Sequence, residues 1–455
     1  MREQSAYVAE EPELRNLKVL FSLMVFLIIT DFVMPQYFGI HIGYDLTCTR
    51  LADLLIVLYM FLNRKILTHF GDMVIHHIFI IPFAIYLFVS IYTMVCRVDI
   101  NSFFLVFLEI LTFYILVYGI RYIVGWKRAI KLSIGCAYFL GIYGLIEFFY
   151  GQSIYLKFFS TVPNSVANSY RSGFYRIMGP CGHALGYGLL LLLFIALACM
   201  DIEKDEVYLF KRPFLIGLLY VNVFLTGSRS TLGIALIEML LIVLISGAKN
   251  IKKSCIIIFF LLVALGGFLL LFGRTGIGRY VMMQITSVMD QFLGTSYSGI
   301  FGADTTTLDN SEEYRKYLPR IFQLDWLNPW IGRGVSRVFS AQIDGIYIKS
   351  IDNFYVSQYI KYGYPGMIAY ILFIVVAIVF LIRAAWKYHS CVFKLVLIAT
   401  VCYFFNLWWL DALQTLKFEY VLLAIACACY MWKEQMMKCD NEQLCSCIQM
   451  GDKMR

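Results

Sequence analysis

Arg229 lies between two long apolar runs, in the segment Leu-Thr-Gly-Ser-Arg-Ser-Thr-Leu-Gly at positions 225–233. An arginine deep in a bilayer costs about 2.5–3.5 kcal/mol on insertion scales, so a membrane chain keeps one where it has a partner or a function. Arg176 has a similar setting, because Tyr-Arg-Ile-Met-Gly-Pro at positions 175–180 leads into another apolar run near Leu190. Both arginines therefore precede a candidate helix.

Two interpretations of these arginines stay open. A helix start offers free backbone N–H groups and the positive end of the helix dipole, and an arginine beside it makes a site for phosphate or diphosphate. Alternatively, each arginine extends to the lipid headgroups, as arginines near helix ends commonly do. The small residues around Arg229 favour the anion site because they leave open space, and several of them can cap the helix; they are Thr226, Gly227, Ser228, Ser230 and Gly233.

A polar segment at residues 274–353 and the start of the run that follows it contain a second set of candidates. Its motifs are Asn310-Ser311-Glu312-Glu313-Tyr314-Arg315, Asn328-Pro329-Trp330-Ile331-Gly332-Arg333-Gly334, Asp352-Asn353-Phe354-Tyr355 and Tyr362-Gly363-Tyr364-Pro365-Gly366. Asp, Asn, Tyr and Trp side chains can hydrogen-bond to sugars or stack on them. Asn-Pro and Gly-x-Gly are also ordinary turn formers, so a structural interpretation of each motif stays open.

The composition determines which elements position these residues. Of 455 residues, 60% are hydrophobic and only 15% are charged, against about 25% charged in soluble domains. Apolar runs long enough to cross a bilayer recur along the whole chain. We predict a single all-α polytopic membrane domain over residues 1–455 with about twelve transmembrane helices, centred near Val25, Leu55, Ala84, Ile110, Phe139, Leu190, Leu219, Leu236, Leu262, Phe373, Ile398 and Leu423.

Basic residues predict the orientation of these helices. Lys and Arg concentrate in every second connection, which the positive-inside rule assigns to the cytoplasm; these groups are Arg64 and Lys65, Arg121 to Lys131, Lys204 to Arg212, Lys249 to Lys253, and Arg383 to Lys394. Both termini and a tail at residues 433–455 are then cytoplasmic. The loop at residues 274–353, between helices nine and ten, is external and long enough for short helices.

Several classes of function and cofactor are disfavoured. The net charge of +8 is accounted for by membrane topology, so we predict no nucleic-acid partner. Most cysteines lie in apolar runs, and the tail cysteines Cys439, Cys445 and Cys447 fit no strong zinc pattern and have no histidine nearby. We therefore predict no metal site, and we expect no cofactor.

Taken in order, these motifs resemble the O-antigen ligase and polymerase family of bacterial envelope assembly. The matching pieces are Arg176-x-x-Gly179 with His183 and Gly186, Thr226-Gly227-Ser228-Arg229, Ser311 and Arg315, Asn328-Pro329 with Gly332-x-Gly334, Asp352-Asn353-x-Tyr355, and Gly363-x-x-Gly366. The resemblance implies a metal-independent glycosyltransferase of the bacterial cytoplasmic (inner) membrane. Its donor would be a glycan on undecaprenyl diphosphate at the external face, with membrane lipids around it and a chain-length regulator and flippase as possible partners.

The resemblance also implies roles for individual residues. The diphosphate would be bound by Arg176, Arg229, Arg315 and Arg320, and the glycan by His183, Arg333, Asn353 and Tyr355. Arg229, Arg315 and Asp352 would act in catalysis. For His183, a packed helical histidine remains the alternative.

One departure selects a branch of the family. Ligases of this family carry a histidine at the loop exit, where this chain has Asp352, and no histidine occurs from Arg274 to Tyr364. This favours a polysaccharide polymerase for O-antigen, capsule or exopolysaccharide. Asp352 is then a general base, a sugar-binding group or a helix N-cap.

Two other functions remain as alternatives. A ligase would attach the glycan to a lipid or protein acceptor. A lipid-linked oligosaccharide transporter would suit twelve spans with intramembrane charges, although the two halves show no evident repeat.

Overall fold

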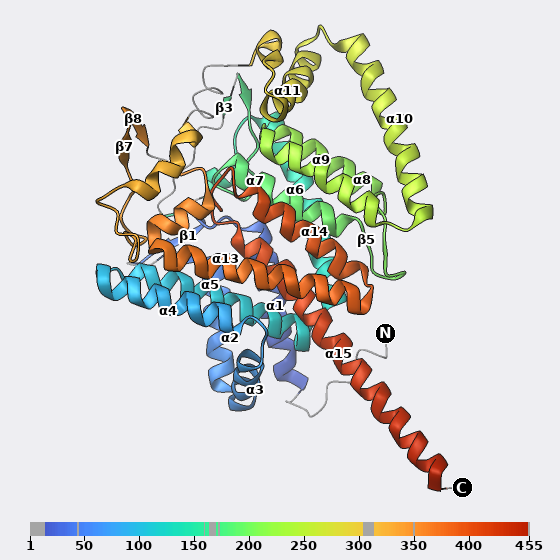
Figure 1. Cartoon of the computed structure of the whole chain (residues 1–455). Coiled ribbons are helices and arrows are strands. Elements are labelled where there is room, and N and C mark those ends of the chain that lie inside the picture. The colour runs from blue at the N-terminus through green and yellow to red at the C-terminus, as the bar shows by residue number, and fades with distance from the viewer. Residues whose placement is uncertain are drawn as a thin grey trace.

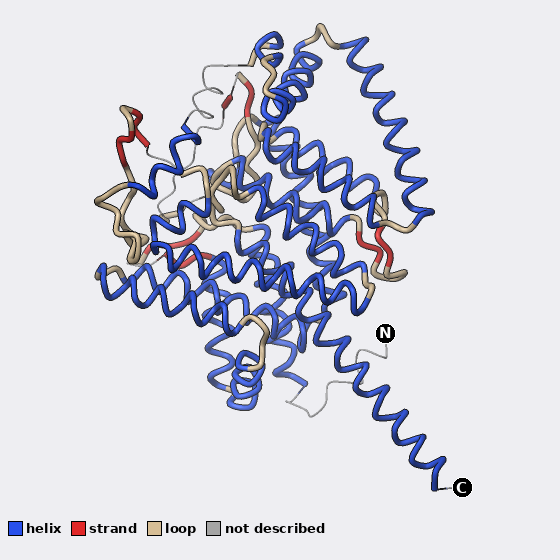
Figure 2. The backbone as a smooth tube through the Cα atoms, viewed as in Figure 1, coloured by secondary structure: helices blue, strands red, loops and turns tan. Residues whose placement is uncertain are grey.

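The computed structural model describes residues 14–42, 45–158, 160–162, 170–171, 173–303, 314–348 and 351–453. It is a helical bundle with only short two-stranded hairpins, which confirms the predicted all-α membrane class (Figures 1 and 2). All twelve predicted centres lie in helices. Five described helices or continuous helical segments are long and apolar enough to cross a membrane, at Ile80–Arg97, Ile100–Val124, Trp126–Tyr150, Ala248–Phe272 and Phe354–Tyr388. The full number of spans and their orientation stay predictions.

The first half of the chain forms seven α-helices. They are α1 (Leu14–Val33), α2 (Cys48–Leu62), α3 (Arg64–Ile75), α4 (Ile80–Arg97), α5 (Ile100–Tyr118), α6 (Trp126–Tyr150) and α7 (Ala184–Ala198). A π-helical turn, Gly119–Val124, joins α5 to α6, and a 3-10 turn, Ile154–Lys157, follows α6. Hairpins link some of them, formed by β1 (Gly39–His41) with β2 (Asp45–Thr47) and by β3 (Tyr170–Arg171) with β4 (Phe174–Tyr175).

The second half continues the bundle. After the hairpin of β5 (Met200–Asp201) and β6 (Glu206–Val207) come α8 (Pro213–Leu225), α9 (Arg229–Ile245), α10 (Ala248–Phe272) and α11 (Gly276–Leu293). The bundle closes with α13 (Phe354–Tyr388), α14 (Cys391–Asn406) and α15 (Leu416–Lys453). The predicted tail at residues 433–455 is helical as far as Lys453, because α15 continues through it without a break.

α7 forms the centre of the bundle. Its side chains are apolar on all sides, which is typical of a buried helix, and those from Leu189 to Cys199 are at most 1% exposed. α6, α8, α9 and α14 all pack against it. α10 is the opposite case, since none of its apolar segment is buried and it stands apart from the bundle in Figure 1. A helix whose apolar segment is left unburied by the protein is suited to contact with lipid.

The predicted loop at 274–353 contains the short helical segments expected of it. These are α11 and the 3-10 turns Tyr297–Phe301 and Leu318–Gln323. It also contains a hairpin that was not predicted, formed by β7 (Ala341–Ile343) and β8 (Ile346–Ile348). Ser311, part of the loop motif, lies outside the described residues.

The Asn-Pro and Gly-x-Gly motif of the loop attaches it to the bundle. The carbonyl of Pro329 accepts a hydrogen bond from the Tyr364 amide at 2.7 Å, at a break in α13 where Gly363 has a φ of 68°. Arg333 and Gly334 donate their backbone N–H groups to Ile360 and Lys361. This motif therefore fixes the loop relative to α13.

The turn between α4 and α5 holds the same loop from another side. The Asp99 carboxylate accepts hydrogen bonds from the Val335 and Ser336 amides and from the hydroxyls of Ser102 and Ser336. Burial opposes ionisation of Asp99, but these donors outweigh it and lower the pKa of its carboxyl below the ordinary value. The loop is thus anchored at two places distant in sequence.

Gly363 tests this attachment. A Cβ at position 363 would lie 2.4 Å from the Pro329 carbonyl oxygen, and the positive φ disfavours any L side chain. We expect Gly363→Ala to lower the free energy of unfolding by more than about 1 kcal/mol, seen as a lower thermal midpoint in detergent. In the control Gly217→Ala, nothing lies within 4 Å of the added Cβ, and α8 should be unchanged or more stable. Equal midpoints for Gly363→Ala and the wild type would contradict the proposed attachment.

Candidate active site

The Thr-Gly-Ser-Arg segment is the turn between α8 and α9. Gly227 has a φ of 60°, which reverses the chain direction between the two helices. Ser228 is the N-cap of α9, and its hydroxyl accepts a hydrogen bond from the Thr231 amide at 3.4 Å. Arg229 is the first residue of α9 and is only 7% exposed. The predicted position of Arg229 at a capped helix start is confirmed.

Arg176 lies against this turn. The Ile177 amide donates to the carbonyl of Leu225 at 3.3 Å, and Nε of Arg176 donates to the carbonyl of Thr226 at 2.7 Å. A Cβ on Gly227 would lie 3.3 Å from Nε of Arg176, so the glycine leaves room for the guanidinium to pass. The two arginine motifs, about fifty residues apart in sequence, form one structural unit.

A small cavity brings three arginines together. Arg171, Arg176 and Arg229 line it with Gly227, and α11 closes it with Tyr280, Met283, Gln284 and Ser287. The cavity has a volume of about 30 Å³, close to the space of one water molecule. A diphosphate is larger, so its binding requires α11 or the β3–β4 hairpin to move outward.

Arg176 retains hydrogen-bonding capacity in this cavity. It is 9% exposed, and its Nη2 has no partner among the described residues. Burial lowers the pKa of its guanidinium to about 10, which leaves Arg176 cationic at neutral pH. A buried donor without a partner costs about 1–3 kcal/mol, or more when charged, and an anionic ligand would remove that cost.

Glu147, near the end of α6, positions the segment that carries Arg176. One carboxylate oxygen accepts hydrogen bonds from the Tyr175 hydroxyl at 2.7 Å and the Met178 amide at 2.8 Å, and the other accepts from the Gly179 amide at 2.9 Å. These three donors come from both sides of Arg176. Glu147 therefore binds the segment that presents Arg176.

His183 is the N-cap of α7, just before the helix rather than inside it. Its Nδ1 accepts a hydrogen bond from the Leu185 amide at 3.0 Å. Burial, together with the neighbouring charges of Arg176 and Arg171, lowers the pKa of the imidazole to about 4, and the charge of Asp352 opposes this effect. The ring is therefore neutral at pH 7 with its hydrogen on Nε2, where it can donate but cannot accept a proton.

Asp352 lies next to Arg315 at the end of the loop. Nη2 of Arg315 and Oδ2 of Asp352 are 3.4 Å apart, and both side chains are partly buried. The helix N-cap at this point is Asn353, not Asp352. The end of α14 links the starts of α13 and α9, because the Phe354 amide donates to the Leu407 carbonyl and the Asn406 side chain donates to the Thr231 hydroxyl.

Asn353 and Tyr355 have structural contacts. The Asn353 side chain accepts from the Val356 amide at 3.0 Å and donates to the Trp408 carbonyl at 2.9 Å. The Tyr355 hydroxyl donates to the Phe404 carbonyl at 2.8 Å. These bonds position the start of α13 against the end of α14, and the proposed contact of either residue with a glycan stays a prediction.

Arg320 and Arg333 do not line the cavity among the described residues. Arg320 pairs with Asp344 in the turn between β7 and β8, where both side chains are about half exposed. The Arg333 guanidinium lies over the Trp326 ring, 5.0 Å from its centroid. Their predicted roles toward diphosphate and glycan would require contacts with parts of the substrate outside this cavity.

Several lining residues were not predicted. Arg171 was not assigned to the site from the sequence. Tyr280, Gln284 and Ser287 recur at helical spacing on one face of α11, a polar stripe that signals an amphipathic helix. Glu147 has no such signal, because its role depends on a contact about thirty residues away.

Replacement of Glu147 tests whether it positions Arg176. In Glu147→Gln, an amide N–H₂ replaces one acceptor of the backbone amides, and we expect glycan transfer to fall by at least about tenfold because Arg176 loses its fixed orientation. Transfer is measured in membranes containing equal amounts of folded protein. The matched control is Glu238→Gln on α9, whose carboxylate has no hydrogen-bond partner among the described residues. Equal activity of the two variants would show that Glu147 has no positioning role.

Comparison with known families gives one match. Residues 214–371 match the O-antigen ligase family. No curated protein matches the chain. The matched region contains the Thr-Gly-Ser-Arg turn, α11, and the loop that leads from Arg315 and Asp352 into α13, whereas Arg176 and Glu147 lie before it. This match over residues 214–371 agrees with the O-antigen ligase and polymerase family that the motifs predicted.

Proposed function

We propose that this multi-pass membrane protein is a polysaccharide polymerase. It transfers a growing glycan from undecaprenyl diphosphate to a lipid-linked repeat unit at the external face of the membrane. The family supports glycan transfer of the O-antigen ligase or polymerase type. The main support for a diphosphate donor is that Arg171, Arg176 and Arg229 line one cavity at the capped start of α9.

In this proposal the arginines bind the diphosphate of the donor. The start of α9 adds the positive end of its helix dipole, and Nη2 of Arg176 supplies a buried donor. Guanidinium groups bind phosphate oxygens through paired hydrogen bonds. Binding would move α11 or the β3–β4 hairpin outward, since both border a cavity too small for the ligand.

The transfer step forms one bond and breaks another. The acceptor hydroxyl oxygen attacks the anomeric carbon of the donor glycan, and the bond from that carbon to the diphosphate oxygen breaks. The bonding electrons leave on the diphosphate, where preorganised arginines stabilise the developing charge. The hydroxyl proton passes to the Asp352 carboxylate, which Arg315 holds at the loop exit.

Two observations favour a polymerase over a ligase. The sequence has no histidine from Arg274 to Tyr364, where ligases of this family carry their proposed base. His183 cannot take that role, because its Nδ1 already accepts the Leu185 amide and its pKa is about 4. Asp352 is then the group at this position that can accept a proton.

Reconstitution tests this function directly. Purified protein supplied with several undecaprenyl-diphosphate-linked repeat units should form a ladder of longer glycans, and the ladder should persist in EDTA. Arg229→Ala should reduce chain extension by about 100-fold or more, because a donor to the leaving group is lost. The matched control is Arg337→Ala, which removes an exposed arginine of the loop at residues 274–353 that has no proposed role in the site. Transfer to a lipid or protein acceptor without extension would identify a ligase, and vesicle uptake without extension would identify a transporter.

Asp352→Asn tests the proposed base. Because an amide cannot accept the proton, we expect the rate of extension to fall by about 10²–10⁴-fold while donor binding, measured by displacement of a labelled lipid diphosphate, changes little. Arg315→Ala should also slow extension, through loss of the contact that orients Asp352. Asp344→Asn, in the exposed β7–β8 turn, is the control. An Asp352→Asn enzyme that extends glycans at the wild-type rate would rule out Asp352 as the base.

A further inference from the structure

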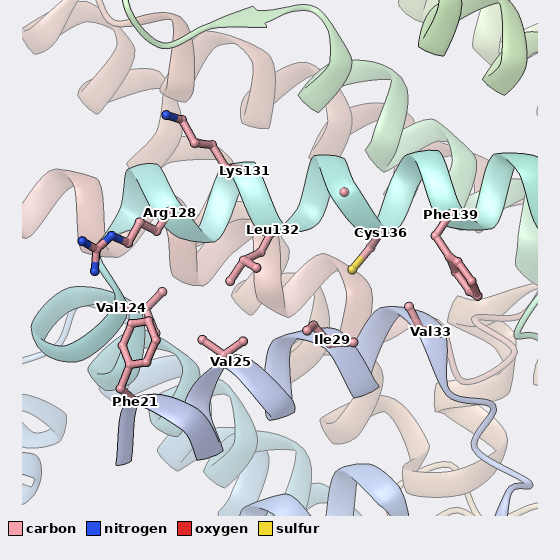
Figure 3. Close-up of a pocket in the computed structure, with 11 residues that line it drawn as sticks. Phe21, Val25, Ile29, Val33, Val124, Arg128, Lys131, Leu132, Cys136 and Phe139 are labelled. Carbon is pink, nitrogen blue, oxygen red and sulfur yellow. The ribbon is translucent and has the colours of Figure 1, made fainter. Parts of the chain in front are cut away.

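An open apolar groove runs between α1 and α6, away from the arginine cavity. Its volume is about 660 Å³. Phe21, Val25 and Val33 line it from α1, and Leu132, Cys136 and Phe139 line it from α6. Figure 3 shows these side chains in the space between the two helices. The groove has the character of a site for a hydrocarbon chain.

Two cations mark one end of this groove. Arg128 and Lys131 are among its lining residues, and both lie in the first two turns of α6. Their side chains are exposed and belong to a connection that the basic-residue pattern predicts to be cytoplasmic. A ligand of this groove would therefore have an apolar body and an anionic end.

The dimensions fit one leaflet of a bilayer. Arg128 and Phe139 are eleven residues apart on α6, which corresponds to about 16 Å along the helix axis. Half of a hydrocarbon core about 30 Å thick is about 15 Å. A chain lying in the groove with its polar end at Arg128 would thus end near the middle of the membrane.

Gly135 keeps the middle of the groove open. It lies on α6 between Lys131 and Phe139 and lines the groove. Nothing lies within 4 Å of a Cβ added at this position. A larger side chain at position 135 would therefore start in open space and extend into the groove. A substitution here can be used to fill the groove.

We propose that this groove binds an anionic phospholipid of the cytoplasmic leaflet. One acyl chain lies between α1 and α6, and the phosphate lies between Arg128 and Lys131. Charge complementarity favours an anionic over a zwitterionic lipid, because basic residues near a membrane surface each strengthen binding to anionic lipid by about fivefold. Two such residues give a preference of roughly 25-fold. The site is separate from the proposed diphosphate site, since Glu147 and the Arg176 segment lie at the other end of α6.

Lipid titration of the purified, full-length protein tests the charged end of the site. Native mass spectrometry would measure binding of phosphatidylglycerol and of phosphatidylcholine with the same acyl chains. We expect one phosphatidylglycerol to bind at least tenfold more tightly, and Arg128→Gln with Lys131→Gln to remove that preference. Lys127→Gln is the matched control, because Lys127 lies over Trp126 and does not line the groove. Equal binding of the two lipids to the wild type would overturn the proposal.

A second variant tests the apolar part of the site. Gly135→Phe should reduce binding of both lipids by at least tenfold, whereas Gly217→Phe on α8, where an added Cβ also meets open space, should leave it unchanged. If Gly135→Phe does not fold, photo-crosslinking of a phosphatidylglycerol with a reactive acyl chain to the wild type tests where the acyl chain binds. Labelled peptides should come from α1 and α6, and labelling elsewhere would overturn the proposal. Displacement of the label by undecaprenyl phosphate at equal concentration would identify the carrier lipid as the occupant and would also overturn it.

Discussion

The crowding of buried positive charge is the constraint on which the candidate site depends. Guanidinium groups of like charge repel one another, and the repulsion grows as water is excluded. Arg176 and Arg229 are nevertheless both less than a tenth exposed and line one cavity. A flexible chain would let them separate. The surrounding structure prevents this through the three hydrogen bonds accepted by Glu147 and through the bond from Arg176 to the Thr226 carbonyl.

This constraint explains why the motifs contain so many residues with no evident chemistry. Gly227 leaves room for Arg176, and Ser228 caps the helix that begins with Arg229. Gly363 and Pro329 attach the loop at residues 274–353 to α13, while Asn353 joins the start of α13 to the end of α14. Most of the recognisable pattern therefore holds a few charged groups in place. In the proposed polymerase, a preorganised site of this kind would stabilise a departing diphosphate without reorganising during the reaction.

Periodicity and composition predicted the helices well, because an apolar run of sufficient length has few alternatives in a membrane. The twelve predicted centres all lie in helices, and the N-cap at Ser228 followed from local turn chemistry. Contacts between distant segments were not predictable in the same way. Glu147 belongs to none of the sequence motifs, and only the folded chain shows that it binds the Arg176 segment. The cavity-lining residues of α11 were not predicted for the same reason, since a polar helical face does not show which segment of the chain it packs against.

Asp352 and Asn353 show how neighbouring residues of similar chemistry divide their roles. Asp352 was a candidate for the helix cap, and the backbone allows only one residue to be the N-cap of α13. Asn353 takes that position and uses both ends of its amide for structural bonds. The carboxylate of Asp352 is therefore not needed to cap the helix and lies beside Arg315. A carboxylate can accept a proton and an amide cannot, so this division places the residue able to act as a base next to a charged partner and leaves the inert one to hold the helix.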